Sequence, residues 1–403
     1  MGRAMMGAGQ LVGPAFGARV LARIDKGLVA GAIEATLPDG MQRLIGGHAP
    51  GPRARITLHR WRALVRLVTG GSIGWYRGWE DGDWSSDDPV PIFDLFMRNR
   101  VSLGATARAG GPRRWLARVN HWRRRNHPAQ ARENIEAHYD LGNDFYAAWL
   151  DDTLTYSSAL FADPSEPLEQ AQHRKLAAIL ERTGARPGDT VLEIGCGWGS
   201  FAEAAARAGV HVHGLTLSRE QARFVEDRMA RQQLAGVTVS LTDYRDERGR
   251  YDAIASIEMV EAVGEEYWPA YLDTIARCLK PGGRAAIQLI SIADDTFRAY
   301  ADNVDFIQQY IFPGGMLISE SRFRALAGAR GLQWRDRHGF GLDYAETLRR
   351  WRERFDIADR EGRLPARLDK RFRDRWRFYL MYCEGGFRGG GIDVAQVTLV
   401  KGD

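Results

Sequence analysis

The run VLEIGCGWG at residues 191–199 holds the side chains and backbone with the clearest chemical potential. It places an acid, Glu193, two positions before the first of three glycines, Gly195, Gly197 and Gly199. Glycine lets a backbone approach a ligand closely, although any tight strand-to-helix turn also favours it. Here a strand, an acid, three glycines and a following helix occur together, at the sheet edge where doubly wound folds bind ligands. The combination predicts a nucleotide-type site.

The next predicted strand discriminates between nucleotide classes. A dinucleotide site shows an acid about 20 residues further on, which holds a ribose. This chain has GLTLS at residues 214–218 instead, and it lacks the GKS or GKT of a phosphate-binding loop. Glu193 would repel a pyrophosphate but would suit the ammonium of a methionine moiety. The pattern therefore favours S-adenosylmethionine over NAD.

A framework of alternating strands and helices is predicted from residue 127 onward. Strands are expected in TVLEIGCGWG, VHVHGLTLS, VTVSLTD, YDAIASIEM and RAAIQLISI. The helices between them are expected in SFAEAAARAG, REQARFVEDRMARQQ and EEYWPAYLDTIARCLKPGG. This alternation predicts βαβ units and an α/β fold with a parallel, doubly wound, Rossmann-like sheet.

The remaining segments suggest three further parts. Residues 294–345 are helix-rich and aromatic, which predicts an insertion over the top of the sheet before a last strand in GIDVAQVTLVK. Residues 1–106 predict a smaller N-terminal α+β domain, with a helix closing into a turn in LARIDKGLVAGAIEATLPDG and short strands in IGWYRGWEDGDW. Residues 107–126 are basic and contain two tryptophans, and we expect them to link this domain to a second domain at residues 127–403.

The overall composition limits the number of domains and the cellular compartment that we expect. A chain of 403 residues can form two domains, and its formal charge of +5 suits contact with anionic surfaces. Three sparse cysteines without metal-ligand spacing favour a reducing compartment over a disulfide scaffold, and they predict no metal site. The sequence has no apolar run of about 18 residues and no signal-peptide pattern at its start. We therefore expect a cytoplasmic protein whose membrane contact is peripheral, at the inner face.

Seven motifs follow the order found in one enzyme family. They are HYDLGNDFYAAWLD, LTYSSALF, VLEIGCGWGS, GLTLSREQ, DYRDERGRYDAIASIEMVEAVG, DFIQQYIFPGGMLIS and YLMYCEGGFR. Over residues 130–400 the chain thereby resembles the cyclopropane fatty acid synthases and the related mycolic acid methyltransferases, with a weaker likeness upstream to their accessory N-terminal domain. The resemblance implies a class I methyltransferase fold, S-adenosylmethionine as the methyl donor, and the double bond of an unsaturated (phospho)lipid acyl chain as the acceptor.

The resemblance also implies cofactor contacts at matching motif positions. They are Tyr156 and Ser157 at the methionine end, Glu193, Gly195, Gly197 and Gly199 in the cradle from Val191 to Gly199, Thr216, Leu217 and Gln221 near the ribose, and Tyr244 and Arg245 beside the adenine. A flat tyrosine face would stack on a purine, and the alternative interpretation of Tyr244 is a plain surface aromatic.

The implied chemistry places demands on a second set of residues. An alkene is a weak nucleophile, so the enzyme must hold an electrophilic methyl donor in line with it. Methyl transfer leaves a carbocation, which carboxylates, aromatic faces and exclusion of water would stabilise. A base must then take a proton from the new methyl group for a ring to close. The resemblance implies that this base is a bicarbonate ion held by the protein. The matching catalytic positions are Glu261, Tyr379, Ser158, Ile292 and Cys383.

Three positions depart from the family pattern. Ser158 stands where cysteine is common, Ala262 where histidine is frequent, and Ile290 where a histidine occurs on the fifth strand. The first change matters little if the backbone N–H is the working contact, whereas the last removes a direct ligand for the anion. Bicarbonate binding, and with it ring closure, is thereby placed in doubt. Cys383 has no basic neighbour in the sequence, which favours a structural role as a small hydrophobe.

Several functions remain open at this point. The sequence favours cyclopropane formation, and the alternatives are a methyl-branched or methylene product without ring closure, or methyl transfer to the nitrogen of a small molecule. The N-terminal domain and the basic linker favour lipid. A regulatory or lipid-binding protein with an inactive methyltransferase fold is disfavoured by the intact glycine loop together with Glu261 and Tyr379.

The linker predicts a means of reaching a membrane. GPRRWLARVNHWRRRN concentrates arginines and tryptophans, which favour anionic headgroups and the interfacial region. Docking on an anionic membrane surface is the prediction, and a solvated linker is the alternative. Nothing else in the chain supports nucleic-acid binding, and the sequence leaves the oligomeric state open, a homodimer included.

Overall fold

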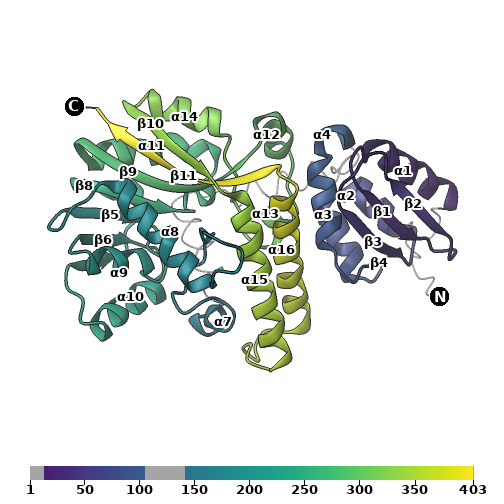
Figure 1. Ribbon diagram of the computed structural model, residues 1–403, viewed down its shortest axis with the longest axis horizontal. Helices are drawn as coiled ribbons and strands as arrows, with labels where there is room; N and C mark the ends of the chain where they lie inside the picture. The colour runs from purple at the N-terminus through teal and green to yellow at the C-terminus, as the bar shows by residue number, and fades with distance from the viewer. Residues whose placement is uncertain (1–12, 105–140, 403) are drawn as a thin grey trace, which may run out of the picture. The chain divides into compact units, whose positions relative to one another are not determined.

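The computed structural model describes residues 13–104 and 141–402, so the predicted linker at 107–126 lies outside the described residues. Within them the chain forms two compact units, each of which combines segments that are distant in the sequence. The first unit comprises residues 13–104, 298–311 and 369–391, and the second comprises residues 141–297, 312–368 and 392–402. Figure 1 labels the elements of both units.

The second unit is built on a seven-stranded sheet with the order β10-β11-β9-β8-β5-β6-β7 (Figure 1). Its strands are β5 (Thr190–Ile194), β6 (His211–Leu215), β7 (Val237–Ser240), β8 (Tyr251–Ile257), β9 (Leu279–Ile292), β10 (Leu332–Gly339) and β11 (Ile392–Lys401). The pairs from β9 to β7 are parallel, and β11 runs antiparallel to both β9 and β10. The chain order reverses at β5, so the carboxyl end of β5 is the switch point where such sheets bind ligands.

Helices connect these strands and cover both faces of the sheet (Figure 1). They are α7 (Asn143–Ala147), α8 (Leu168–Thr183), α9 (Ser200–Arg207), α10 (Arg219–Arg231), α11 (Trp268–Cys278), α12 (Asp294–Ala301), α14 (Glu320–Gly328) and α15 (Gly341–Arg360). The predicted α/β, doubly wound fold is confirmed, including the five expected strands β5 to β9.

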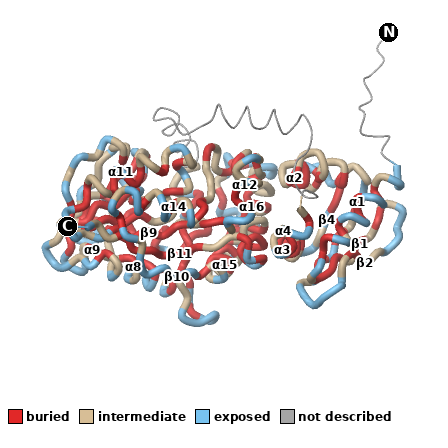
Figure 2. Tube along the Cα trace, turned by 90° about the horizontal axis from the view of Figure 1, so that it is seen from above, coloured by how far each residue is buried: buried red, intermediate tan, exposed pale blue. Residues whose placement is uncertain are grey.

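Burial explains why the central strands form. β8 is buried along almost its whole length, as expected for a strand covered on both faces. One core cluster joins Leu176 and Ile179 of α8 to Val191 of β5 and Phe201 of α9. Figure 2 shows buried residues concentrated along the middle strands of this sheet.

One strand was not predicted. β10 lies within residues 294–345, for which the sequence indicated helix-rich structure. Its sequence LQWRDRHG buries only Leu332, because the strand lies at the edge of the sheet and pairs with β11 alone. An edge strand exposed in this way lacks the apolar alternation that identifies a strand in a sequence.

The first unit contains a four-stranded sheet in the order β2-β1-β3-β4, which confirms a smaller N-terminal α+β part. Its elements are α1 (Pro14–Gly27), β1 (Ala32–Thr36), β2 (Gln42–Gly46), β3 (Arg53–Leu58), α2 (Arg62–Glu80), β4 (Trp84–Ser85), α3 (Val90–Arg98), α4 (Arg100–Leu103), α13 (Phe306–Tyr310) and α16 (Lys370–Arg388). The helix predicted through LARIDKGLVAGAIEATLPDG ends at Gly27, and the rest of that run forms β1 and a turn.

The prediction of short strands in IGWYRGWEDGDW was wrong. Most of that run belongs to α2, and β4 covers only Trp84–Ser85. The backbone at Gly71 has φ +55° and ψ −139°, which divides α2 into two helical halves. A Cβ at Gly74 would come within 1.9 Å of the carbonyl oxygen of Arg66, so the halves pack too closely for a side chain there. The glycines therefore serve a helical turn-back and not strand turns.

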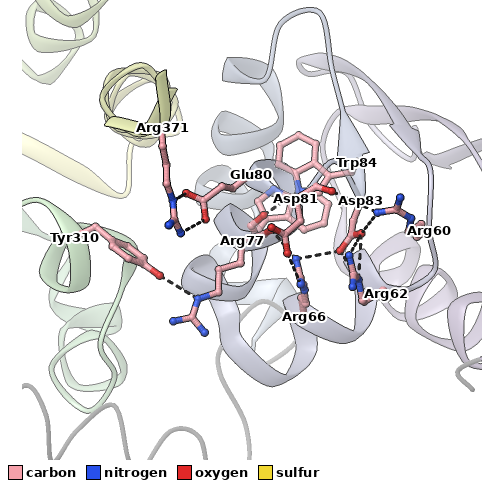
Figure 3. Close-up of polar contacts among 11 residues, drawn as sticks. Arg60, Arg62, Arg66, Arg77, Glu80, Asp81, Asp83, Trp84, Tyr310 and Arg371 are labelled. Carbon is pink, nitrogen blue, oxygen red and sulfur yellow. Dashed lines mark hydrogen bonds and ion pairs between the residues drawn. The ribbon is translucent and has the colours of Figure 1, made fainter. Parts of the chain in front are cut away.

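A buried carboxylate fixes the end of this helical pair (Figure 3). The side chain of Asp83 is fully buried and forms ion pairs with Arg60, Arg62 and Arg66 at 3.2, 2.7 and 3.1 Å. Because a buried charge is costly unless it is paired, these three arginines stabilise the turn before β4. In the same view, Arg77 donates to the hydroxyl of Tyr310 and Arg371 to the carboxylate of Glu80, which ties α13 and α16 to α2.

Between residues 13 and 104 and between residues 141 and 402, no helix is both long enough and apolar enough to cross a bilayer.

Candidate functional site

The glycine loop links β5 to α9 at the carboxyl edge of the sheet. The N–H groups of Gly195 and Cys196 donate to the carbonyl of Leu215 at 3.1 and 3.0 Å, which joins the loop to the end of β6. Gly195, Gly197 and Gly199 have φ values of +83°, +52° and +80°, a region that side chains disfavour. Nothing lies within 4 Å of a Cβ built at Gly197. The loop therefore leaves open space at its middle glycine, as a ligand cradle requires.

Glu193 lies beneath this loop and is 3% exposed. Within the described residues its Oε2 has no hydrogen-bond partner. Burial raises the pKa of the Glu193 carboxyl well above its usual range, and the positive charge of Lys175 opposes that rise. A cationic ligand at Oε2 would offset the cost of the buried carboxylate. This fits the ammonium of a methionine moiety.

The residues expected near the ribose surround the start of α10. The hydroxyl of Thr216 donates to Oε1 of Gln221 at 2.8 Å and accepts from the N–H of Ser218 at 3.1 Å. Ser218 caps the helix by accepting from the N–H of Gln221. This leaves Nε2 of Gln221 buried and without a partner among the described residues, while Leu217 is half-buried between its neighbours.

The residues expected beside the adenine lie in the short helix η1 (Tyr244–Asp246). Tyr244 is 8% exposed, so it is not the plain surface aromatic of the alternative interpretation. Its ring packs edge-on against Tyr271, and its buried hydroxyl has no partner among the described residues. Arg245 lies over the Tyr244 ring and is fixed by two hydrogen bonds to Asp243 at 2.8 and 2.6 Å.

Three predicted cofactor residues, Glu193, Gln221 and Tyr244, thus present buried polar atoms that the described chain does not satisfy. Buried polar groups are nearly always hydrogen-bonded, so such atoms gathered around one sheet edge indicate a polar ligand. Together with the open space at Gly197, they fit a bound S-adenosylmethionine.

The segment 155–159 approaches the same region from before α8. The hydroxyl of Ser157 accepts from Nζ of Lys175 at 2.6 Å. The ring of Tyr156 is surrounded by other aromatic rings, with centroid distances of 5.5 Å to Tyr146, 5.7 Å to Trp149 and 5.4 Å to Trp351. The predicted methionine-end residues therefore adjoin an aromatic cluster.

Glu261 follows β8 in the short helix η2 (Val260–Ala262). Its Oε1 accepts from the N–H of Ile290, and its own carbonyl accepts from the N–H of Met316 at 2.7 Å. Its Oε2 is buried without a partner among the described residues. Burial and then the charge of Glu258 raise the pKa of Glu261 to about 8. The carboxyl is therefore positioned at the end of β9 and titrates near neutral pH.

Glu258 is a candidate site residue that the sequence analysis missed. It accepts at Oε1 from the N–H of Ser158 at 2.8 Å and from Nε2 of Gln288 at 2.7 Å. Its Oε2 accepts from the hydroxyl of Tyr344 at 2.7 Å. Burial raises its pKa, and these hydrogen bonds oppose the rise. An acid that directly follows a buried strand, three residues before Glu261, is the signal that could have identified it.

The other predicted catalytic residues divide between the two units. Ile292 lies at the end of β9, and its N–H donates to the carbonyl of Ile318 at 2.9 Å. Tyr379 and Cys383 lie on α16 in the first unit, where the Tyr379 ring packs edge-on against Trp376. Burial and the nearby Asp305 raise the pKa of the Cys383 thiol, which disfavours a reactive thiolate. The catalytic roles of Tyr379 and Cys383 stay predictions.

Comparison with known proteins places these motifs in a family. The family model for mycolic acid cyclopropane synthetases matches residues 126–397. The chain belongs to this family. It is accordingly an S-adenosylmethionine-dependent methyltransferase, as its sequence predicted.

Curated relatives and solved structures extend the comparison. The chain is 39% identical over 375 residues to the tuberculostearic acid methyltransferase of Mycobacterium tuberculosis, covering 88% of this chain and 85% of the relative. It is 34% identical over 362 residues to the cyclopropane-fatty-acyl-phospholipid synthase of Escherichia coli, covering 89% and 90%. A cyclopropane synthase structure from Mycobacterium tuberculosis matches with a TM-score of 0.63 at 31% identity, covering 67% of this chain and 98% of that one.

A further family member was solved with SAH and CTAB. This mycolic acid cyclopropane synthase matches with a TM-score of 0.62 at 32% identity, over 67% of this chain and 98% of that one.

Proposed function

We propose that the protein transfers a methyl group to the double bond of an unsaturated lipid acyl chain, and that the product keeps a double bond instead of closing a cyclopropane ring. The observation that supports this product is the hydrogen bond from the N–H of Ser158 to the carboxylate of Glu258. The carboxylate of Glu258 thereby uses the backbone N–H of position 158, which was the possible working contact at this family position.

The other groups assigned to bicarbonate are also engaged or altered. The N–H of Ile292 donates to Ile318, and Oε1 of Glu261 accepts from Ile290. Ile290 and Ala262 offer no side-chain donor where the family has histidine. An anion held among these residues would have to displace existing hydrogen bonds, which is unfavourable for a buried charge. This supports a reaction that proceeds without bicarbonate.

The proposed chemistry needs no base or counter-charge other than the chain's own carboxylates. S-Adenosylmethionine supplies an electrophilic methyl group and leaves as the neutral thioether. The alkene gives its π pair to the methyl carbon, which leaves a cation on the chain. That cation loses a proton from an adjacent C–H bond, and the released electron pair forms a new double bond. A hydride shift before this loss would give a methylene product, and direct loss would give a methyl-branched alkene.

Glu261 is the proton acceptor in this scheme. Its Oε2 is unpartnered among the described residues, and its pKa of about 8 leaves a useful ionised fraction near neutral pH. Glu258 has a different role, because its oxygens are already held by three donors. It is a fixed negative charge that favours the developing cation.

The aromatic cluster adds to this stabilisation. The ring of Trp351 lies between Tyr156 and Tyr344, with centroid distances of 5.4 and 6.1 Å, and Tyr344 holds Glu258. Aromatic faces attract cations, and bulky rings exclude water that would otherwise trap a carbocation. The lipid substrate is supported by the names of the two curated relatives, a tuberculostearic acid methyltransferase and a cyclopropane-fatty-acyl-phospholipid synthase.

The product is tested with purified protein, S-adenosylmethionine and vesicles of a monounsaturated phosphatidylglycerol. Mass spectrometry should show the added mass of one methylene group, and mild catalytic deuteration should then add deuterium to the product chain. A cyclopropane has the same mass but takes up no deuterium under those conditions, so an unreactive product would overturn the proposal.

Two further measurements complete this test. Turnover should be equal in buffer with bicarbonate and in buffer purged of carbon dioxide, and strong dependence on bicarbonate would contradict the proposed role of Glu258. If amines are methylated and lipids are not, the activity is methyl transfer to nitrogen.

We also propose that residues 107–126, outside the described residues, dock the enzyme on anionic membrane. The arginines and tryptophans of this segment support the proposal.

A further inference from the structure

Lys175 is a fully buried cation that the proposed chemistry does not use. It lies on the inner face of α8, where the neighbouring positions are Ala171, Leu176 and Ile179. A lysine is almost never fully buried unless its ammonium has partners. Its Nζ donates to the hydroxyl of Ser157 at 2.6 Å.

Three acidic side chains near Lys175 oppose the effect of burial on its ammonium. Burial lowers the pKa of Lys175 to about 8, and the carboxylates of Glu258, Asp151 and Glu193 oppose that effect, in this order of strength. The cation therefore lies among three acids, of which Glu193 and Glu258 belong to the candidate site. Its hydrogen bond to Ser157 is charge-assisted, which makes it stronger than one between neutral groups.

The same face of α8 holds the backbone around Ser157. Nε2 of Gln172, one turn before Lys175, donates to the carbonyl of Ser157 at 3.0 Å and to that of Thr155 at 3.4 Å. On the far side of the segment, the N–H of Ala159 donates to the hydroxyl of Thr347 at 3.1 Å. Residues 155–159 are thus fixed by α8 on one side and by α15 on the other.

The direction of the lysine bond decides what Ser157 can offer a ligand. An ammonium has only donors, so the Ser157 oxygen must accept from it. The hydroxyl hydrogen then points away from Lys175 and is available to an acceptor. The methionine part of S-adenosylmethionine carries one strong acceptor, its carboxylate, and Glu193 suits the ammonium on the same carbon.

We propose that Lys175 is a positioning residue that, through Ser157, orients a hydroxyl to donate to the carboxylate of the cofactor's methionine moiety. This inference rests on S-adenosylmethionine as the cofactor and not on the lipid product. Lys175 is separated from the cofactor by two hydrogen bonds, one to Ser157 and one from Ser157 to the carboxylate. Its positive charge therefore lies near that carboxylate. Lys175 should favour binding of the amino-acid end of the cofactor and have no effect on the adenosine end.

The test compares two ligands that share the adenosine part. S-Adenosylhomocysteine has the amino-acid group, and 5′-methylthioadenosine lacks it. Calorimetry on the full chain should show that Lys175→Met, which keeps the length and apolar stem of the side chain, weakens S-adenosylhomocysteine about tenfold or more, as expected for a hydrogen bond to a charged group. The affinity for 5′-methylthioadenosine should stay within about twofold, because the variant removes no contact to it.

Two additional variants separate positioning from simple loss of structure. Ser157→Ala should reproduce the selective loss, and the double variant should lose no more than either single one, since both remove the same contact. Lys280→Met is the control, because that lysine is half-exposed on β9 and pairs with Asp252; both affinities should equal those of the parent.

Three outcomes would overturn the inference. They are equal weakening of both ligands by Lys175→Met, no weakening of either, and additive losses in the double variant. If Lys175→Met does not fold, Ser157→Ala alone decides, since a selective loss supports the inference and a non-selective one contradicts it. Because calorimetry involves no lipid and no turnover, failure of the proposed lipid product would leave this result standing.

Discussion

The backbone N–H of Ser158 lies 2.8 Å from Oε1 of Glu258, a carboxylate one hundred positions further along the chain. This contact joins the segment before α8 to the end of β8, the fourth strand of the alternating framework. The contact uses the backbone of Ser158 and not its side chain, so a cysteine at this position could form it equally well. In the proposed function, this carboxylate takes the place of the external anion.

The charge of Glu258 should contribute, after burial, to the pH at which the enzyme becomes active. Because that charge helps to raise the pKa of Glu261 to about 8, Glu258→Gln should lower the pKa and move the rising limb of kcat/KM to lower pH. The maximum rate should fall about tenfold or more, since a charge facing the cation is lost. Glutamine can still accept from Ser158 and Gln288, so folding should persist.

A variant at an exposed acid provides the control for this pH profile. Glu361→Gln alters an exposed acid that pairs with Arg363, and its profile should match the parent. An unchanged or upward-shifted limb in Glu258→Gln would show that the two acids do not interact in the working enzyme.

Gly197 should be essential for the cofactor. Gly197→Val places a branched side chain in the open space of the glycine loop, and we expect binding of S-adenosylhomocysteine to fall below detection. The backbone strain of valine at positive φ must be separated from this effect. Gly188 has φ +92° and equally open surroundings in an exposed turn, so Gly188→Val introduces similar strain away from the ligand. Calorimetry should find normal affinity there, and a comparable loss in both variants would refute a steric role.

The sequence could predict the elements of the candidate cofactor site because they follow local rules. A glycine loop after a strand, an acid beneath it and a capped helix after the next strand are all visible within short windows. The structure adds that Glu193, Gln221 and Tyr244 leave buried atoms unsatisfied. No local sequence pattern could show this, because whether a buried polar atom is hydrogen-bonded depends on all of its neighbours in the folded structure.

The reacting centre was less predictable because its contacts are distant in the sequence. Glu258 depends on Gln288 and Tyr344, which lie 30 and 86 positions away. A buried glutamate with φ +49° after a strand also defies the usual expectation of a solvated acid. In the first unit, the glycines around Gly71 resemble strand turns, and only their packing shows that they allow two helices to meet.

The linker should bring the enzyme to the membrane. Replacing Arg123, Arg124 and Arg125 by Ser should reduce sedimentation with phosphatidylglycerol vesicles and activity on them, while activity on detergent-dispersed lipid survives. The effect should weaken as salt rises, because exposed charges are screened. Replacing Arg219, Arg223 and Arg231, which are exposed on α10, changes the formal charge equally and should leave sedimentation intact. Equal behaviour of the two triple variants would show that total charge, and not the linker, governs binding.

Glu261 should make the fold less stable as pH rises. The pKa of Glu261 is about 8 in the folded chain, against 4.5 for an ordinary glutamate such as that of the unfolded chain. Between these pH values the folded form therefore binds more protons than the unfolded form. The stability contributed by the protonated carboxyl is complete below pH 4.5 and is lost as pH rises through about 8. The total loss is at most roughly 5 kcal/mol, and structural relaxation would reduce it.

Glu261→Gln isolates this contribution, because glutamine resembles the protonated acid and can still accept from Ile290. The variant should match the parent in thermal unfolding at about pH 5 and exceed it by several degrees at about pH 9. Its turnover should nevertheless fall about a hundredfold or more, since the proton acceptor is gone. Glu361→Gln, again the exposed control, should follow the parent at both pH values. A constant difference between Glu261→Gln and the parent across this range would mean that Glu261 is already ionised at low pH, and it would remove the reason for assigning the titration near pH 8 to this residue.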